Sequence, residues 1–142
     1  MIKITKYSKL SDILKFVPIF REKYANLSAE EIEYYLSITV KTSKYRLLIA
    51  QNENEEVIGM AAFHIGAMLY CGKYIQVSSL FVRDNSRNQG VAQLLMGNIE
   101  MEGKAKNCDN IVLDSFTNNI TSHEFYQKLG FEKKTIHFMK KL

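Results

Sequence analysis

Three residue types are scarce in this chain of 142 residues, which has no tryptophan, one proline and two cysteines. With Pro18 alone and no Ser/Gly-rich linker, nothing divides the chain, so we expect a single domain over residues 1–142. Cys71 and Cys108 are far apart and lie near no histidine cluster, so we expect no metal site. No apolar run approaches the ~20 residues of a membrane span, and no signal peptide is visible. We therefore predict a cytoplasmic protein without a membrane partner.

The charge is only mildly biased. The formal net charge is +4, which favours an anionic ligand without indicating nucleic acid. The densest lysines, at 133–134 and 140–141, are typical of a solvated strand edge, where lysine also discourages aggregation. We expect no nucleic-acid partner.

The order of patterns predicts an α/β fold of the α+β hybrid type. Alternating or apolar runs predict strands at 1–7, 45–50, 57–69, 74–82, 111–114 and 133–140. Helical periodicity predicts a helix from Ser8 or Ser11 that Pro18 ends or kinks, and further helices at 28–40, 90–105 and 122–129. The helix at 28–40 opens with the capping box Ser28 to Glu31, and we expect its residues Ile32, Tyr35, Leu36 and Val40 to face inward. We expect a mixed, mostly antiparallel sheet of six or seven strands, a parallel central pair that includes 111–114, and about four flanking helices.

One strand–loop–helix stretch, residues 78–96, is a candidate anion site. Its loop ends in Arg87-Asn88-Gln89-Gly90-Val91-Ala92. The N-terminus of a helix carries unpaired N–H groups and a partial positive charge, and glycine lets a phosphate come close to them. We expect Val91, Leu94, Leu95 and Ile99 of this helix to be buried. Alone, this pattern is weak, because most such junctions bind nothing.

A second motif lies some thirty residues further on, Asn119-Ile120-Thr121-Ser122-His123-Glu124-Phe125-Tyr126 followed by Gly130-Phe131. Together with the loop motif and the order of elements, it resembles the GNAT superfamily of N-acetyltransferases, and the resemblance covers essentially the whole chain. The C-terminal third further resembles a branch of small bacterial members that includes aminoalkylphosphonate acetyltransferases.

The resemblance implies acetyl-CoA as co-substrate and assigns residues to it. The pyrophosphate would lie on the helix that begins at Gly90, and the pantetheine arm would pair with the strand before it. The implied cofactor-binding residues are Leu80, Phe81, Val82, Arg87, Asn88, Gln89, Gly90, Val91, Ala92, Asn119 and Ser122. Tyr126 is the implied general acid, since a phenol suits reprotonation of a thiolate. Packing for Tyr126, and helix capping for Asn119, are the plainer alternatives.

The general base stays open. Many relatives carry a carboxylate on the strand before the loop, where this chain has Gln76, Ser78 and Ser79. Water relayed through Ser79 or Gln76 is one alternative, and His64 or His123 is another. We expect the acceptor pocket to be built from aromatic and apolar residues, namely Phe20, Tyr24, Leu27, Phe63 and Tyr70.

The resemblance implies an N-acetyltransferase that acts on a primary amine, in a ternary complex, and we expect a monomer or homodimer. A small-molecule acceptor is favoured because no acidic run on the acceptor side would suit a basic peptide. A peptide N-terminus or a lysine is the alternative acceptor, and a non-catalytic CoA-binding module is the alternative class.

Overall fold

The computed structural model describes all 142 residues. Its contacts divide the chain into two compact units, Met1–Val112 and Leu113–Leu142. No helix combines the length and the apolar character that a membrane crossing requires.

A single five-stranded sheet organises the first unit, with its strands in the order β1-β2-β3-β4-β5. The strands are β1 (Lys3–Tyr7), β2 (Arg46–Gln51), β3 (Val57–Met68), β4 (Gly72–Val82) and β5 (Asn110–Leu113). The first four pair antiparallel. The connection from β4 to β5 runs through a helix, as the parallel alignment of these two strands requires. The predicted parallel pair is confirmed, although β5 is the last strand of the sheet and not a central one.

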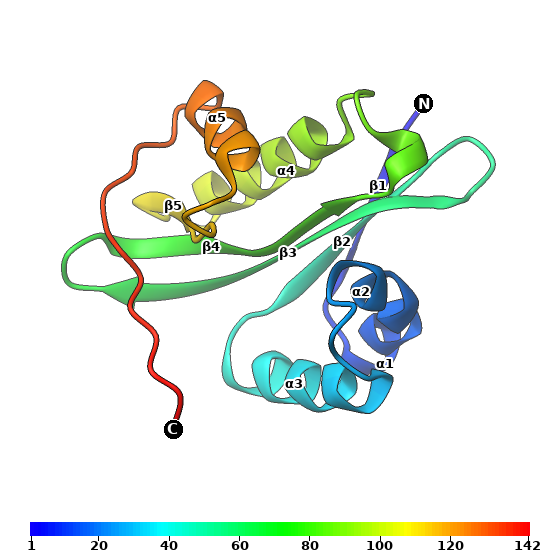
Figure 1. The fold of residues 1–142 in the computed structure, drawn as a ribbon, viewed down its shortest axis with the longest axis horizontal. Helices are drawn as coiled ribbons and strands as arrows, with labels where there is room; N and C mark the ends of the chain where they lie inside the picture. Colours follow the sequence, from blue (N-terminus) through cyan, green and yellow to red (C-terminus); the bar gives the residue numbers. More distant parts are fainter. The chain divides into compact units, whose positions relative to one another are not determined.

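Helices α1 (Leu10–Ile13), α2 (Val17–Lys23) and α3 (Ala29–Thr42) cover one face of the sheet (Figure 1). Between them and the strands lies a core of buried apolar side chains, including Ile13, Leu36, Leu47 and Met60. The capping box that opens α3 is present, with the Glu31 N–H donating to Ser28 Oγ at 3.1 Å and the Ser28 N–H donating to Glu31 Oε1 at 3.0 Å.

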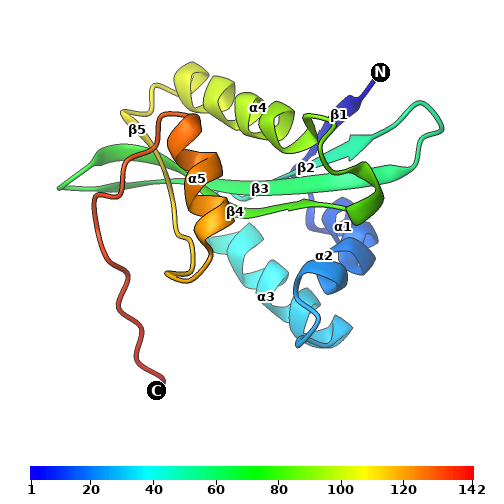
Figure 2. The ribbon, with the colours of Figure 1, turned by 45° about the horizontal axis from the view of Figure 1, so that its top comes forward.

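Helix α4 (Val91–Ala105) covers the opposite face of the sheet (Figure 2). It buries Val91, Leu95, Met96 and Ile99. A Cβ on Gly103 would come within 2.7 Å of Ile75 Cγ2 on β4. Gly103 therefore lets the end of α4 approach the sheet closely.

The second unit contains helix α5 (Ile120–Lys128), followed by Gly130 with φ of +94°. The predicted C-terminal glycine of this helix is confirmed. The residues after Phe131 form no helix or strand.

The structure corrects several sequence-based expectations. The predicted last strand, 133–140, does not form, so the sheet has five strands and not six or seven. Alternation shows that a segment can be a strand, but a strand also needs a partner edge, and Phe138 and Met139 are 90% and 87% exposed. The helix predicted before Pro18 is interrupted, as expected, by the 3₁₀ turn Leu14–Phe16. Pro18 itself stands in the first turn of α2, where its missing N–H costs nothing.

Two helix faces also differ from prediction. Tyr35 on α3 is 52% exposed, not inward, and Leu94 on α4 is 39% exposed while Met96 is buried. Both helices were expected to bury a wider stripe than the sheet covers.

Candidate functional site

The loop before α4 has the geometry of an anion site. Gly90 is the N-cap of α4, with a left-handed φ of +77° and no side-chain cap. The first helical hydrogen bond runs from the Leu94 N–H to the Gly90 carbonyl, at 3.0 Å. The N–H groups of Val91, Ala92 and Gln93 therefore have no acceptor within the helix. Nothing lies within 4 Å of the place where a Cβ on Gly90 would stand, so an anion can approach the end of the helix.

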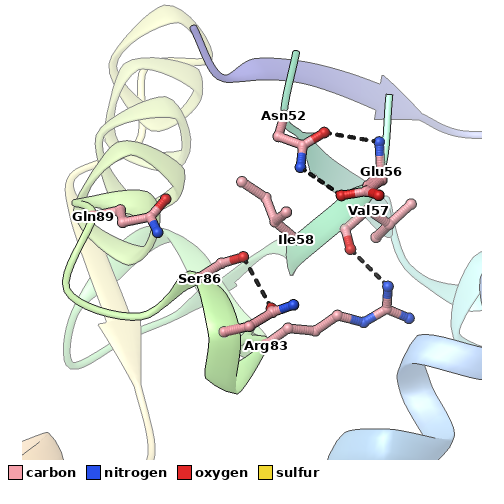
Figure 3. A pocket seen from close by; sticks show the side chains of 8 residues that line it. Asn52, Glu56, Val57, Ile58, Arg83, Ser86 and Gln89 are labelled. Atoms are coloured by element: carbon pink, nitrogen blue, oxygen red, sulfur yellow. Dashed lines mark hydrogen bonds between the residues drawn. The ribbon is translucent and has the colours of Figure 1, made fainter. Parts of the chain in front are cut away.

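Arg83 and Ser86 hold this loop in place. The Arg83 guanidinium donates to the Glu22 carboxylate on α2, with the shortest contact at 2.5 Å, and to the Val57 carbonyl on β3 at 2.7 Å. Ser86 is buried, and its hydroxyl donates to Asn85 Oδ1 at 3.2 Å. Figure 3 shows Arg83 directed at β3. Arg83 therefore has a structural role that the sequence motif did not reveal.

Arg87, predicted to contact the cofactor phosphate, is turned toward its own loop. Its guanidinium lies 3.0 Å from Asp84 Oδ1 and donates to the Val82 carbonyl at 3.3 Å. Its side chain is 58% exposed. Arg87 can therefore reach a ligand, but it would have to exchange the Asp84 carboxylate for that ligand.

The other predicted cofactor residues of the first unit lie at the end of β4 and in the loop between β4 and α4. Leu80, Phe81 and Val82 form the end of β4, and Asn88 has a left-handed φ of +62°. Gln89 lines a polar surface hollow of about 440 Å³ together with Asn52, Glu56, Val57, Ile58, Arg83, Asn85 and Ser86 (Figure 3). None of the other predicted cofactor residues lines this hollow, so we do not identify it with the cofactor site.

A β-bulge interrupts β4 just before Leu80. The register against β3 steps from Ala62 opposite Ser79 to Phe63 opposite Val77, so Ser78 is the extra residue. A bulge leaves its extra residue outside the ladder and re-aims side chains. Here the Ser78 hydroxyl lies 3.1 Å from His64 Nδ1. This bulge was not predictable from the sequence, because the strand pattern of β4 continues through it.

The next residue, Ser79, contacts the segment after α2 through its side chain. Ser79 is buried, and its hydroxyl lies 2.7 Å from the Tyr24 hydroxyl, which comes from the residue after α2. Ser79 thus has a side-chain partner of its own. Of the predicted acceptor-pocket residues, Tyr24 alone has a polar contact with β4.

The rest of the predicted acceptor pocket does not assemble. Phe20 and Phe63 are 3% and 1% exposed. Phe20 belongs to the core under α1–α3, and Ala62 belongs to that core as well. Because strand side chains alternate, Phe63 faces the other side of the sheet. Tyr70 is 68% exposed at the β3–β4 turn. An aromatic composition could not distinguish core residues from pocket residues.

In the second unit, Asn119 caps α5. Its Oδ1 accepts a hydrogen bond from the Ser122 N–H at 3.2 Å. The capping interpretation of Asn119 is thereby confirmed, and Ser122 contributes its backbone to the same cap.

Tyr126 lies on α5 against Phe125 and Phe131, with ring centroids 5.4 and 5.9 Å from its own. Partial burial raises the pKa of its phenol above the ordinary value of 10.0. The phenol therefore keeps its proton at neutral pH and can act as a hydrogen-bond donor or an acid.

His123, an alternative base, is occupied elsewhere. Its Nε2 donates to the Phe116 carbonyl at 2.8 Å, which leaves Nδ1 as the acceptor nitrogen. That nitrogen is buried without a hydrogen-bond partner, so it is not accessible to a substrate amine in this arrangement.

The five-stranded sheet, its bulged strand β4 and the glycine-capped helix α4 that follows it form an α+β fold with a candidate anion site. The sequence matches the acetyltransferase (GNAT) family over residues 13–131. The chain therefore belongs to this family of acetyltransferases.

Two curated relatives match part of the chain. Human N-acetyltransferase 8 is 29% identical over 86 residues, 60% of this chain and 37% of the relative. The aminoglycoside N(6')-acetyltransferase type 1 of Acinetobacter haemolyticus is 29% identical over 68 residues, 46% of this chain and 47% of the relative. The matched stretches thus span less than half the length of either relative.

Solved structures share the fold over the full chain. An aminoglycoside N-acetyltransferase, AAC(6')-Iy in complex with CoA, aligns with a TM-score of 0.84 at 20% identity, covering 99% of this chain and 95% of that one. An acetyltransferase from Pyrococcus furiosus aligns with a TM-score of 0.81 at 19% identity, covering 99% of this chain and 100% of that one. At this identity the likeness establishes the fold. The comparisons give no support to the aminoalkylphosphonate branch.

Proposed function

We propose that this protein transfers the acetyl group of acetyl-CoA to the primary amine of a small molecule, by direct attack in a ternary complex. The observation that carries the proposal is the N-terminus of α4, where three N–H groups without helical acceptors follow an open left-handed glycine in a GNAT chain. Such a site suits the pyrophosphate of CoA.

Gly90, Val91 and Ala92 would hold the pyrophosphate by their backbone, with Arg87 adding charge. The end of β4, at Leu80–Val82, would pair with the pantetheine arm. CoA would supply the activated acetyl group. Asn119 and Ser122 would support the cofactor through the first turn of α5.

Tyr126 would protonate the departing thiolate. Because burial raises the pKa of its phenol, the group is protonated at neutral pH and has a proton to give. General acid catalysis contributes roughly 10²- to 10⁴-fold.

A small-molecule acceptor is favoured by one curated relative, which is named for acetylation of an aminoglycoside. The competing acceptor is a peptide N-terminus or a lysine side chain. The competing class is a CoA-binding module without catalysis.

The test is release of CoA thiol from acetyl-CoA against a panel of amines. The panel holds an aminoglycoside, an aminoalkylphosphonate, a polyamine and an N-terminal peptide. We expect turnover with at least one small amine and a loss of roughly 10²-fold in kcat for Tyr126→Phe, with unchanged affinity for acetyl-CoA.

Other outcomes separate the alternatives. Turnover of the peptide alone would replace the small-molecule acceptor. Binding of acetyl-CoA without any turnover would favour the non-catalytic module, and failure to bind acetyl-CoA would overturn the proposal. Faster turnover of the aminoalkylphosphonate than of the polyamine would restore the branch that the comparisons do not support.

A further inference from the structure

His64 and Ser78 form a polar pair where β4 is irregular. His64 lies on β3, and its Nδ1 is 3.1 Å from the hydroxyl of Ser78, the extra residue of the bulge. A bulge at this position costs ladder hydrogen bonds, so it requires a compensating contact or a use. The bulge brings the Ser78 hydroxyl to a histidine that a regular strand would leave without it.

This pair lies on the same face of the sheet as the Tyr24–Ser79 pair. Met60 and Ala62 of β3 belong to the core under α1–α3, and His64 follows at the same alternation. Opposite Ala62 lies Ser79, whose hydroxyl meets Tyr24 at 2.7 Å. Two serine hydroxyls with aromatic partners therefore stand side by side, immediately before Leu80–Val82.

The surroundings of His64 favour its neutral form. Gln76 is its cross-strand neighbour, and the Tyr74 ring stands edge-on with its centroid 5.9 Å away. On the helical side, Tyr24 reaches Ser79, and the Lys23 ammonium lies over the Tyr24 ring. Burial, without any neighbouring charge, lowers the pKa of His64 below its ordinary 6.5. The imidazole is therefore able to accept a proton at neutral pH.

We propose that His64 is the general base that accepts the proton of the acceptor ammonium, with Ser78 as its positioning residue. This inference rests on the proposed function. The Ser78 oxygen accepts from Nδ1–H, which leaves the lone pair of Nε2 for the substrate. His64 would thus fill the role of the strand carboxylate that many relatives carry where this chain has Gln76, Ser78 and Ser79.

The proton and bond changes balance without a further reactant. The ammonium gives one proton to His64 Nε2, which later passes it to water. The neutral nitrogen attacks the thioester carbon, a C–N bond forms and the C–S bond breaks. The nitrogen loses a second proton as it becomes an amide, and the CoA thiolate gains one.

The test is the pH profile of kcat/KM from pH 5 to 10 for wild type, His64→Gln and Ser78→Ala. His137→Gln, which removes an exposed histidine of the C-terminal segment, is the matched control. We expect an acidic limb in wild type and in the control with an apparent pKa below 6.5. In His64→Gln we expect this limb to disappear and kcat/KM at pH 7 to fall roughly 10²-fold. The deficit should shrink above pH 9, where the amine deprotonates without help.

Ser78→Ala changes an exposed side chain and keeps the test valid if His64→Gln folds poorly. It should lower kcat and move the acidic limb, with unchanged affinity for acetyl-CoA. An acidic limb that persists in both variants, with a deficit constant across pH, would overturn the role of His64 while the proposed function stands. A wild type that acetylates no amine would overturn both.

Discussion

Gly90 offers the sharpest test of the phosphate site, through Gly90→Ala. At φ of +77° a side chain is strained, while the space in front of it is open. We expect the strain alone to lower the free energy of unfolding by roughly 1–2 kcal/mol. The new methyl group would stand where a phosphate must approach the Val91 and Ala92 amides.

Loss of one backbone hydrogen bond to a charged phosphate costs about 1.5–3 kcal/mol. This corresponds to a Kd for acetyl-CoA that is roughly 10- to 150-fold higher. Calorimetric titration with acetyl-CoA measures the change, and thermal unfolding without ligand measures the strain separately.

Gly97→Ala is the matched control on the same helix. Gly97 has no positive φ, and a Cβ there would meet nothing within 4 Å. We expect it to raise the free energy of unfolding by up to ~1 kcal/mol and to leave the affinity for acetyl-CoA unchanged. If Gly90→Ala bound acetyl-CoA as tightly as wild type, the assignment of the pyrophosphate to the α4 N-terminus would be wrong.

Three further predictions follow from single contacts. Gly103→Ala should lower the free energy of unfolding by about 1–3 kcal/mol, because the new Cβ would overlap Ile75. Urea denaturation measures this change, and an unchanged midpoint would contradict the close approach of α4 to β4. Asp84→Asn should tighten acetyl-CoA binding by releasing Arg87, with a smaller gain at high salt, whereas weaker binding would mean that the ion pair preorganises the loop. Because folding lowers the pKa of His64, its stabilising contribution is complete above pH 6.5 and is lost as the pH falls below it. The urea midpoint of wild type should therefore drop more between pH 7 and 5 than that of His64→Gln, and parallel drops would contradict the burial of this histidine.

The local elements of this fold were predictable from the sequence because short-range chemistry fixes them. Ser28 and Glu31 cap α3, Asn119 caps α5 and Gly90 begins α4, each through contacts within a few residues. The alternating runs predicted the antiparallel strands. The helical pattern between β4 and β5 indicated that these two strands are parallel, because parallel neighbours need a crossover connection. Two separated motifs in the right order identified the family.

The tertiary structure decided where those elements find partners. The segment 133–140 alternates like a strand, yet only a neighbouring edge could make it one. Phe63 was a candidate pocket residue, but the parity of β3 buries it on the face of the sheet opposite the core under α1–α3. The bulge at Ser78 is a difference in register between two strands, so neither strand encodes it alone. By itself the sequence predicted an anion site in the loop Arg87–Ala92. The pairing of His64 with Ser78 and of Tyr24 with Ser79 depended on tertiary contacts across 14 and 55 residues of chain.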